Sequence, residues 1–236
     1  MKLTIVLCIA FLFMSCKTKT VNQDVVQVIS KSVSQTSTDI KQERMSLSWE
    51  STTEKHPERA SWSDYIVNHM NENLSVYSKA SDVEKFCPKF KTLTDIQKTK
   101  ALSEIVVGMT FYESGYNPLS RMVETTMGVD PVTGMQVASE GLLQLSYQDV
   151  ANYKNKGVTC LFDYKKDKKL ELNKRSILDP ILNLQCGLGI LKHQIIKYGA
   201  FTMEKNVYWA VIKIKGKYSK IDKIADRVIK NTGFCK

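Results

Sequence analysis

The sequence lacks the closely spaced cysteines and histidines that bind metal ions, and it lacks internal repeats. No C-x-x-C pair occurs in its 236 residues, and its three histidines, His56, His69 and His193, do not cluster. A zinc centre needs several such ligands close together, so we predict no metal site, no cofactor and no catalytic Cys–His pair. No internal repeat is visible, which argues against a repeat architecture.

Apolar runs long enough to span a bilayer are also missing at the start of the chain. Met1-Lys2 precedes the short apolar run Leu3 to Met14, as in a secretory signal. Cys16 follows at a position that resembles a bacterial lipoprotein site, although Phe13 stands where leucine is usual. We therefore expect residues 1–16 to be a signal peptide with a lipid anchor at Cys16. The alternative is ordinary cleavage, which would release a soluble periplasmic or secreted product.

A polar stretch follows the signal. Residues 17–57 contain no aromatic residue before Trp49 and are rich in Ser, Thr, Gln, Lys and Glu. Such a stretch buries too little apolar surface to offset its ordering entropy. We predict a flexible tether over residues 17–57, with a short helical turn between Val25 and Ile29, and a folded domain over residues 58–236.

The net charge of +10 indicates an anionic partner: a nucleic acid, an anionic lipid or an acidic polymer. No nucleic-acid motif accompanies the charge, and export makes a nucleic-acid role improbable. An anionic polymer of the cell wall fits better, while the alternative for Lys165 to Lys169 is a simple solvated turn. We expect a monomer located in the periplasm or anchored at the cell surface.

Helical signals dominate the domain. The segment Ser61 to Asp64 can cap a helix that runs to about Asn73. Thr94, with Gln97 three residues on, can form a capping box for the apolar run Ala101 to Ser114.

The clearest helix lies further on. Asp179 is placed to cap it, Pro180 fits its first turn, and Gly199 ends its apolar stripe. Further helices are expected at about 202–213 and 218–231. The predicted fold class is therefore mainly α.

The predicted sheet is a small hairpin insert within residues 157–173. Phe162-Asp163-Tyr164 and Leu170-Glu171-Leu172 would be its strands, and Lys165 to Lys169 its turn.

Cysteine usage predicts two disulfides. Cys8 leaves with the signal and Cys16 is the lipid candidate. The remaining four are Cys87, Cys160, Cys186 and Cys235. Four cysteines in an exported chain allow three connectivities. We predict Cys87 to Cys235, which would tie the ends of the domain, and Cys160 to Cys186, which would pin the insert to the long helix.

Glu113 is the candidate for acid chemistry. Ile105, Met109 and Glu113 form one row of a helix, so a carboxyl follows two apolar residues on a face that should be buried. Burial raises a carboxyl's pKa to where it can hold a proton near neutral pH and donate it. The alternative is a surface residue or a carboxylate paired with a buried arginine.

Three ordered motifs begin at Glu113. They read E-S-G-Y-N-P from Glu113, S-E-G-L-L-Q from Ser139, and D-P-I-L-N-L-Q-C-G from Asp179. Together they resemble the leading motifs of the lysozyme-like lytic transglycosylases over roughly residues 60–236. The resemblance implies a lysozyme-like α-domain that cleaves the glycan strands of bacterial peptidoglycan.

The resemblance also implies roles for single residues. Glu113 would protonate the glycosidic oxygen, Ser139 and Gln144 would line the cleft, and Asn183 would support its floor. Asp179 would be a helix cap. The alternative for Ser139 and Asn183 is scaffolding.

Two departures from the family pattern bear on the chemistry. The late A-Y-N-x-G motif is replaced by Trp209 to Gly216, so its Tyr-Asn pair is missing. The interval from Glu113 to Gly141 is long (141 − 113 = 28) and carries Glu124 and Asp130. This resembles goose-type lysozyme, in which a second carboxylate would activate water.

We therefore predict an exported muramidase that acts through Glu113 and favours hydrolysis, with Glu124 or Asp130 as the second carboxylate. The first alternative is lytic transglycosylation, which needs one carboxylate and leaves a 1,6-anhydro sugar. The second is a wall-binding lipoprotein without catalytic activity.

Overall fold

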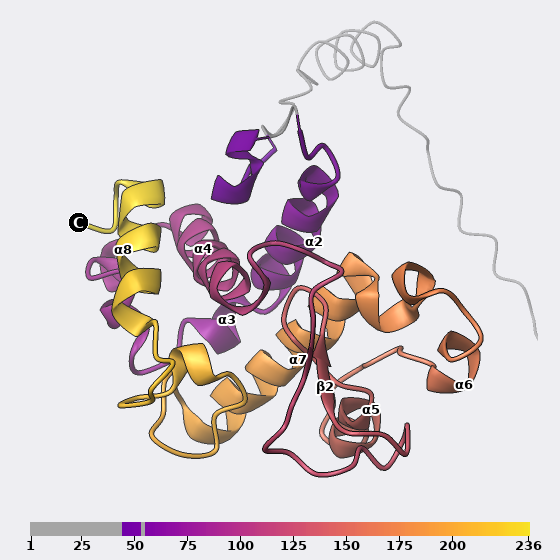
Figure 1. Cartoon of the computed structure of the whole chain (residues 1–236). Coiled ribbons are helices and arrows are strands. Elements are labelled where there is room, and N and C mark those ends of the chain that lie inside the picture. The colour runs from indigo at the N-terminus through magenta and orange to yellow at the C-terminus, as the bar shows by residue number, and fades with distance from the viewer. Residues whose placement is uncertain (1–43, 53–54) are drawn as a thin grey trace, which may run out of the picture. The chain divides into compact units, whose positions relative to one another are not determined.

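The computed structural model describes residues 44–52 and 55–236, and the folded unit begins at Arg44 (Figure 1). The predicted signal peptide, the lipid site at Cys16, the helical turn at 25–29 and most of the tether lie outside the described residues. Leu47 and Trp49, predicted as part of the tether, are buried. The folded unit therefore starts earlier than residue 58.

The unit is mainly helical with one small sheet, as predicted. Its elements are η1 Ser48–Thr52, α2 Arg59–Glu72, α3 Leu74–Tyr77, η2 Val83–Lys85, η3 Phe90–Thr92, α4 Asp95–Ser114, β1 Arg121–Val123, β2 Ala138–Glu140, α5 Gln148–Tyr153, α6 Tyr164–Asp167, η4 Leu172–Lys174, η5 Ser176–Leu178, α7 Pro180–Tyr198, η6 Ala210–Ile212 and α8 Ile221–Thr232. None of the helices described is both long and apolar enough to cross a bilayer.

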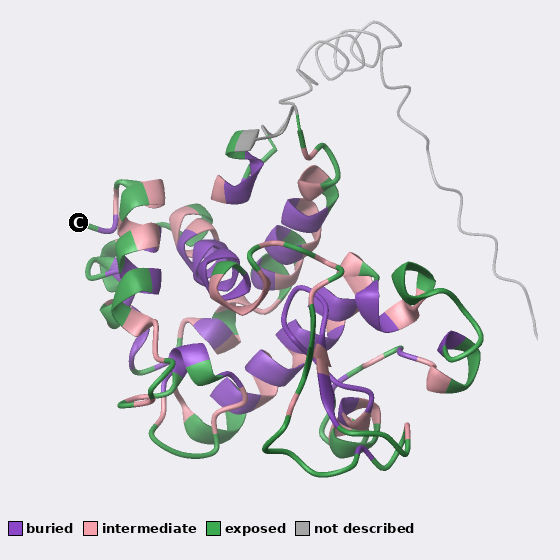
Figure 2. Ribbon diagram, in the orientation of Figure 1, coloured by how far each residue is buried: buried purple, intermediate pink, exposed green. Residues whose placement is uncertain are grey.

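Helix α4 is the centre of the unit. It lies between α2 and α8 (Figure 1) and is buried without interruption from residue 101 to residue 110 (Figure 2). The predicted capping box of Thr94 and Gln97 is present at its start. Gly108 lets α8 approach, because a Cβ there would lie 2.9 Å from Ile224 Cγ2.

Helix α7 is the second long core helix and begins as predicted. The Asp179 side chain accepts a hydrogen bond from the Leu182 backbone N–H, Pro180 occupies the first turn, and Gly199 ends the helix with a left-handed φ of 72°. Helix α2, in contrast, begins at Arg59, ahead of the predicted Ser61 cap, and its N-terminus has no side-chain cap.

The sheet lies elsewhere than predicted. β1 and β2 pair antiparallel, with Arg121 opposite Glu140 and Met122 opposite Ser139. The predicted hairpin at 157–173 is wrong: the Asp163 side chain accepts from the Lys166 backbone N–H and winds the following residues into the turn of α6.

The predicted helix at 202–213 is also wrong. Asn206 has a φ of 60°, which breaks a helix, and Met203 forms a parallel bridge with Lys213. Only the short turn η6 is helical there. The helix expected at 218–231 is confirmed as α8.

Both predicted disulfides are present. Cys87 bonds to Cys235 across a separation of 148 residues, and Cys160 bonds to Cys186 in α7. The first connects the start of the domain to its end, and the second fastens the segment before α6 to the core. Closing long loops restricts the unfolded chain and so stabilises the fold.

Asn183 joins α7 to the segment after β2. Its side chain is fully buried; Nδ2 donates to the carbonyls of Glu140 and Ile177, each at 3.0 Å, and Oδ1 accepts from the Leu143 N–H at 2.8 Å. Gly141, with a φ of 79°, lies against it, and a Cβ there would come within 2.7 Å of Asn183 Cγ.

We predict that Gly141→Ala destabilises the protein more than Gly134→Ala. Both glycines have left-handed φ values, so both variants incur the same backbone cost of about 1–2 kcal/mol. Nothing lies within 4 Å of a Cβ at Gly134, whereas Gly141→Ala also displaces Asn183. Overpacking of this kind should add about 1–3 kcal/mol to the loss.

Urea denaturation of the two variants beside the parent chain measures the difference. Equal losses of unfolding free energy would contradict the role given to the contact between Gly141 and Asn183.

Candidate functional site

Glu113 lies in the last turn of α4, where the helix leaves the core. The residue is half-buried, but its Oε1 is fully buried and has no hydrogen-bond partner within the described part of the chain. Within that part Glu113 forms no salt bridge, so the alternative of a carboxylate paired with a buried arginine does not hold. Glu104, nearer the start of α4, does form one, with Lys100 at 2.9 Å.

The environment of Glu113 favours its protonated form. Burial is the main cause and the charge of Glu124 is the second, and together they raise the pKa of Glu113 from 4.5 to about 7. A backbone hydrogen bond from Val211 opposes the shift in part. A carboxyl with this pKa is divided between its acid and base forms near neutral pH, which suits proton donation.

Glu124 follows β1 and is half-buried. Its Oε1 accepts a hydrogen bond of 2.5 Å from the Ser139 hydroxyl, and its backbone N–H donates to the Val137 carbonyl. These bonds fix the carboxylate within electrostatic reach of Glu113. The structure therefore brings three of the predicted residues together: Glu113, Glu124 and Ser139.

Asp130 has a different setting. One carboxylate oxygen accepts from the backbone N–H groups of Val132 and Thr133, and the other accepts from that of Gln148 at 3.1 Å. The side chain is buried, with 2% of its surface exposed. Asp130 thus holds the β1–β2 loop in shape and ties it to α5.

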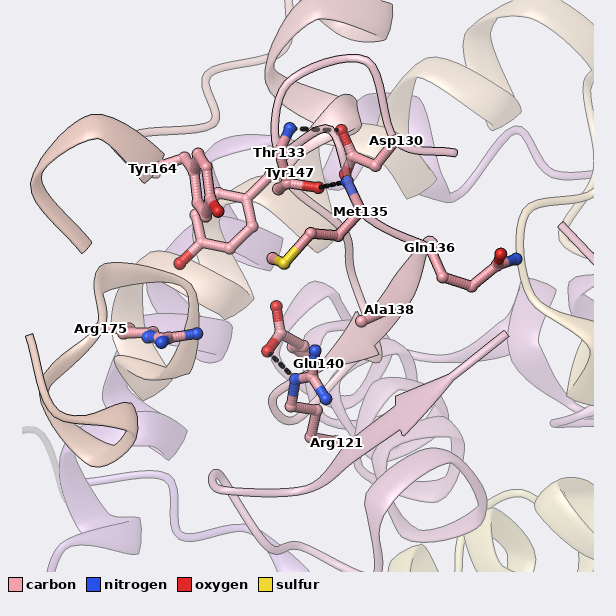
Figure 3. A pocket seen from close by; sticks show the side chains of 10 residues that line it. All are labelled: Arg121, Asp130, Thr133, Met135, Gln136, Ala138, Glu140, Tyr147, Tyr164 and Arg175. Carbon is pink, nitrogen blue, oxygen red and sulfur yellow. Dashed lines mark hydrogen bonds and ion pairs between the residues drawn. The ribbon is translucent and has the colours of Figure 1, made fainter. Parts of the chain in front are cut away.

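Glu140 is also fully engaged. It is buried and forms a salt bridge of 2.7 Å with Arg121, its partner across the sheet (Figure 3). The two line a hollow of about 10 Å³, the size of a single water, together with Asp130, Tyr147 and Arg175. Glu113 is not among the residues that line this hollow.

Gln144 and Asn183, predicted to contact substrate, both serve the scaffold in this arrangement. Gln144 has a φ of 50°, is 8% exposed, and donates from Nε2 to the Gly141 carbonyl at 2.8 Å. Asn183 has no exposed surface. Together they shape the turn that follows Ser139.

The segment around η6 supplies a residue that the sequence analysis missed. The Tyr208 hydroxyl donates to Asp149 Oδ2 at 2.5 Å, and the charge of Glu113 contributes to raising the pKa of Tyr208. A tyrosine therefore stands near Glu113 although the Tyr-Asn motif is absent. The signal was Tyr208 itself, one residue before the stretch compared with that motif.

Asp149 completes this arrangement from the first turn of α5. Burial is the main reason that its pKa rises to about 6, and the bonds from Tyr208 and Ser146 oppose the rise. No group of three or more His, Cys, Asp or Glu side chains in the described ranges is placed to hold a metal ion.

Comparisons with known proteins show the fold. No protein-family model and no curated protein matches the chain. A solved structure of wild-type DslA superposes with a TM-score of 0.62 at 23% identity, covering 82% of this chain and 100% of that one. Two further DslA structures, each with one glutamate-to-glutamine substitution, are 22% identical; the TM-scores are 0.57 and 0.62. They cover 75% and 82% of this chain and 91% and 100% of theirs.

We predict that Glu124→Gln lowers the pKa of Glu113 below about 7, because it removes the neighbouring negative charge. The value should stay above 4.5, since burial is the larger cause. Glutamine can still accept the Ser139 hydrogen bond, so the local geometry is kept. Titration of carbon-13-labelled carboxyl groups by NMR measures the shift.

Glu84→Gln is the matched control, because Glu84 pairs with Lys91 at the surface and lies outside this site. An unchanged Glu113 pKa in Glu124→Gln, or an equal fall in the control, would argue against the coupling of Glu113 and Glu124.

Proposed function

We propose that the chain is a glycosidase of lysozyme-like fold that cleaves the β-1,4 glycan strands of bacterial peptidoglycan by hydrolysis. The observation that carries the proposal is the pairing of two glutamates. Glu113 has a buried Oε1 and a raised pKa, and Glu124 is a carboxylate held by Ser139. The three ordered motifs supply the substrate class. Two carboxyl groups are sufficient to hydrolyse a glycosidic bond without a metal ion.

Glu113 acts as the general acid. In its protonated form it donates a proton to the glycosidic oxygen as the bond to the anomeric carbon breaks, so the leaving sugar departs as a neutral alcohol. Its Oε1, which has no partner in the described residues, is the oxygen available for this transfer.

Glu124 acts as the base. It accepts a proton from the water that attacks the anomeric carbon, and the product gains the hydroxyl at that carbon. The hydrogen bond from the Ser139 hydroxyl holds the Glu124 carboxylate in place. Asp130 is less suited to this role, because three backbone N–H groups occupy its oxygens.

The interval between the two glutamates provides further support. The substituted glutamates of the two DslA variants stand at positions 143 and 154 of that protein, an interval of 11. Glu113 and Glu124 are separated by the same interval (124 − 113 = 11). Because the two folds superpose, equal intervals favour equivalent positions for the two pairs.

Transglycosylation remains the second candidate, on the strength of the motifs alone. In that reaction the 6-hydroxyl of the muramyl residue replaces water, and Glu113 alone would suffice. Glu124 would then have no chemical role, so its placement beside Glu113 favours hydrolysis.

We predict that Glu113→Gln and Glu124→Gln each abolish release of soluble fragments from purified peptidoglycan, with losses of at least about a hundredfold. Mass spectrometry of the fragments made by the parent chain should detect reducing ends. Anhydro-muropeptides would instead establish transglycosylation, and undiminished turnover by Glu113→Gln would overturn the site.

The matched control for these variants is Glu171→Gln, an exposed glutamate paired with Lys174 away from Glu113. It should cleave like the parent chain. If the parent chain binds walls but releases no fragments, the protein is a binding module.

We also predict the pH dependence of cleavage. Glu113 must carry its proton in the free enzyme, and its pKa is raised to about 7. As far as Glu113 determines it, kcat/KM should therefore be constant at pH values below this pKa. Above the pKa it should fall about tenfold per pH unit. Initial rates of cleavage of a soluble glycan fragment, measured from about pH 5 to about pH 9 on both sides of this pKa, test the expected fall. A fall that begins near the ordinary carboxyl pKa would be inconsistent with a buried acid.

A further inference from the structure

Residues 161–175 form a surface that combines exposed leucines with exposed lysines. Leu161, Leu170 and Leu172 are 54%, 43% and 44% exposed, which is unusual for three large apolar side chains on one short segment. The lysines of this segment are Lys165, Lys166, Lys168, Lys169 and Lys174, and all five are exposed. We call this segment the 161–175 surface.

Buried side chains of the same segment hold its backbone in place beneath the exposed leucines and lysines. Phe162 is buried, and Asp167 accepts hydrogen bonds from the Tyr147 hydroxyl at 2.8 Å and from Ser176. The Cys160–Cys186 disulfide fastens the start of the segment to α7. The leucines are therefore exposed on a fixed framework.

A groove of about 720 Å³ runs beside this surface. Its apolar lining includes Leu161, Leu170, Pro118, Leu119 and Leu182. Lys166, Lys174 and Arg175 also line it, together with Asp163, Asp167 and Asp179, so the groove has apolar walls and charged groups of both signs. This volume lies in the range of grooves that accept a small ligand or a lipid headgroup.

The positive charge of the surface is only partly neutralised. Asp163 pairs with Lys166 and Glu171 pairs with Lys174, while Asp167 is buried. The remaining lysines are Lys165, Lys168 and Lys169, and none of them forms an ion pair with another described residue. Arg175, in Figure 3, points into the adjoining hollow, and its Nε has no hydrogen-bond partner in that part of the chain.

We propose that the 161–175 surface docks on a bilayer that contains anionic phospholipids. The leucines would enter the boundary between headgroups and acyl chains, and the lysines would contact lipid phosphates. The exposed leucines favour a bilayer over a soluble polyanion, because a polyanion would use the lysines and leave the leucines in water. This inference is independent of glycan cleavage and of a lipid anchor.

The test measures binding of the full chain carrying Cys16→Ala, which cannot be acylated, to vesicles of equimolar phosphatidylglycerol and phosphatidylcholine. Hydrogen exchange should slow at residues 161–175 on addition of these vesicles and not on addition of phosphatidylcholine alone. Replacing Lys165, Lys168 and Lys169 with glutamine should weaken binding by about a hundredfold at low ionic strength.

A matched variant replaces Lys213, Lys217 and Lys223 with glutamine, which removes the same charge from another exposed region. It should retain most of the binding. Replacing Leu161, Leu170 and Leu172 with serine should also weaken binding, by at least about tenfold.

Three results would overturn the proposal. One is equal loss of binding in both lysine variants, and another is unchanged binding in the leucine variant. The third is protection of residues 161–175 by polyglutamate as strong as that by vesicles, which would make the surface a polyanion site. Glycan cleavage by the same variants should be unchanged, so failure here is distinguishable from failure of the proposed function.

Discussion

The buried amide of Asn183 is the interaction on which the arrangement of the site depends. Two of its three hydrogen bonds join α7 to the turn around residues 140–143, and the third goes to the Ile177 carbonyl in η5. The amide can come so close to the turn only because position 141 is glycine. That turn fixes the end of β2, and β2 carries Ser139. Ser139 in turn holds Glu124 near Glu113. Asn183, which has no exposed surface, therefore helps to set the position of Glu124 relative to Glu113.

The second constraint is the cost of burying Glu113. Helix α4 is buried from residue 101 to residue 110, and the Glu113 carboxyl lies just beyond, where that helix leaves the core. The protein stabilises the proton on Glu113 because its charged form is poorly solvated and lies near Glu124. Such a group makes folding less favourable once it ionises, so its placement is difficult to explain by stability alone. Nearby, the half-buried Tyr208 donates a hydrogen bond to the buried Asp149.

Local signals predicted the long helices, and contacts between distant residues decided the rest. The caps at Thr94 and Asp179 act within four residues, so the sequence was sufficient to place them. The hairpin was misplaced because its alternating pattern near residue 163 competes with the side-chain cap of α6. Glu124 could be named from its position in a long interval, but its preference over Asp130 depends on hydrogen bonds that span the sheet. Tyr208 was missed because its approach to Asp149 joins residues 59 positions apart.

The most direct measurement is a structure of the full chain carrying Glu113→Gln with a bound peptidoglycan oligosaccharide. If Glu113 is the acid and Glu124 the base, the scissile glycosidic oxygen should lie within about 3 Å of the amide at position 113. A water should then lie between Glu124 and the anomeric carbon on the opposite face of the sugar. An oligosaccharide that binds away from these two residues, or whose 6-hydroxyl occupies the position of that water, would contradict hydrolysis at this site.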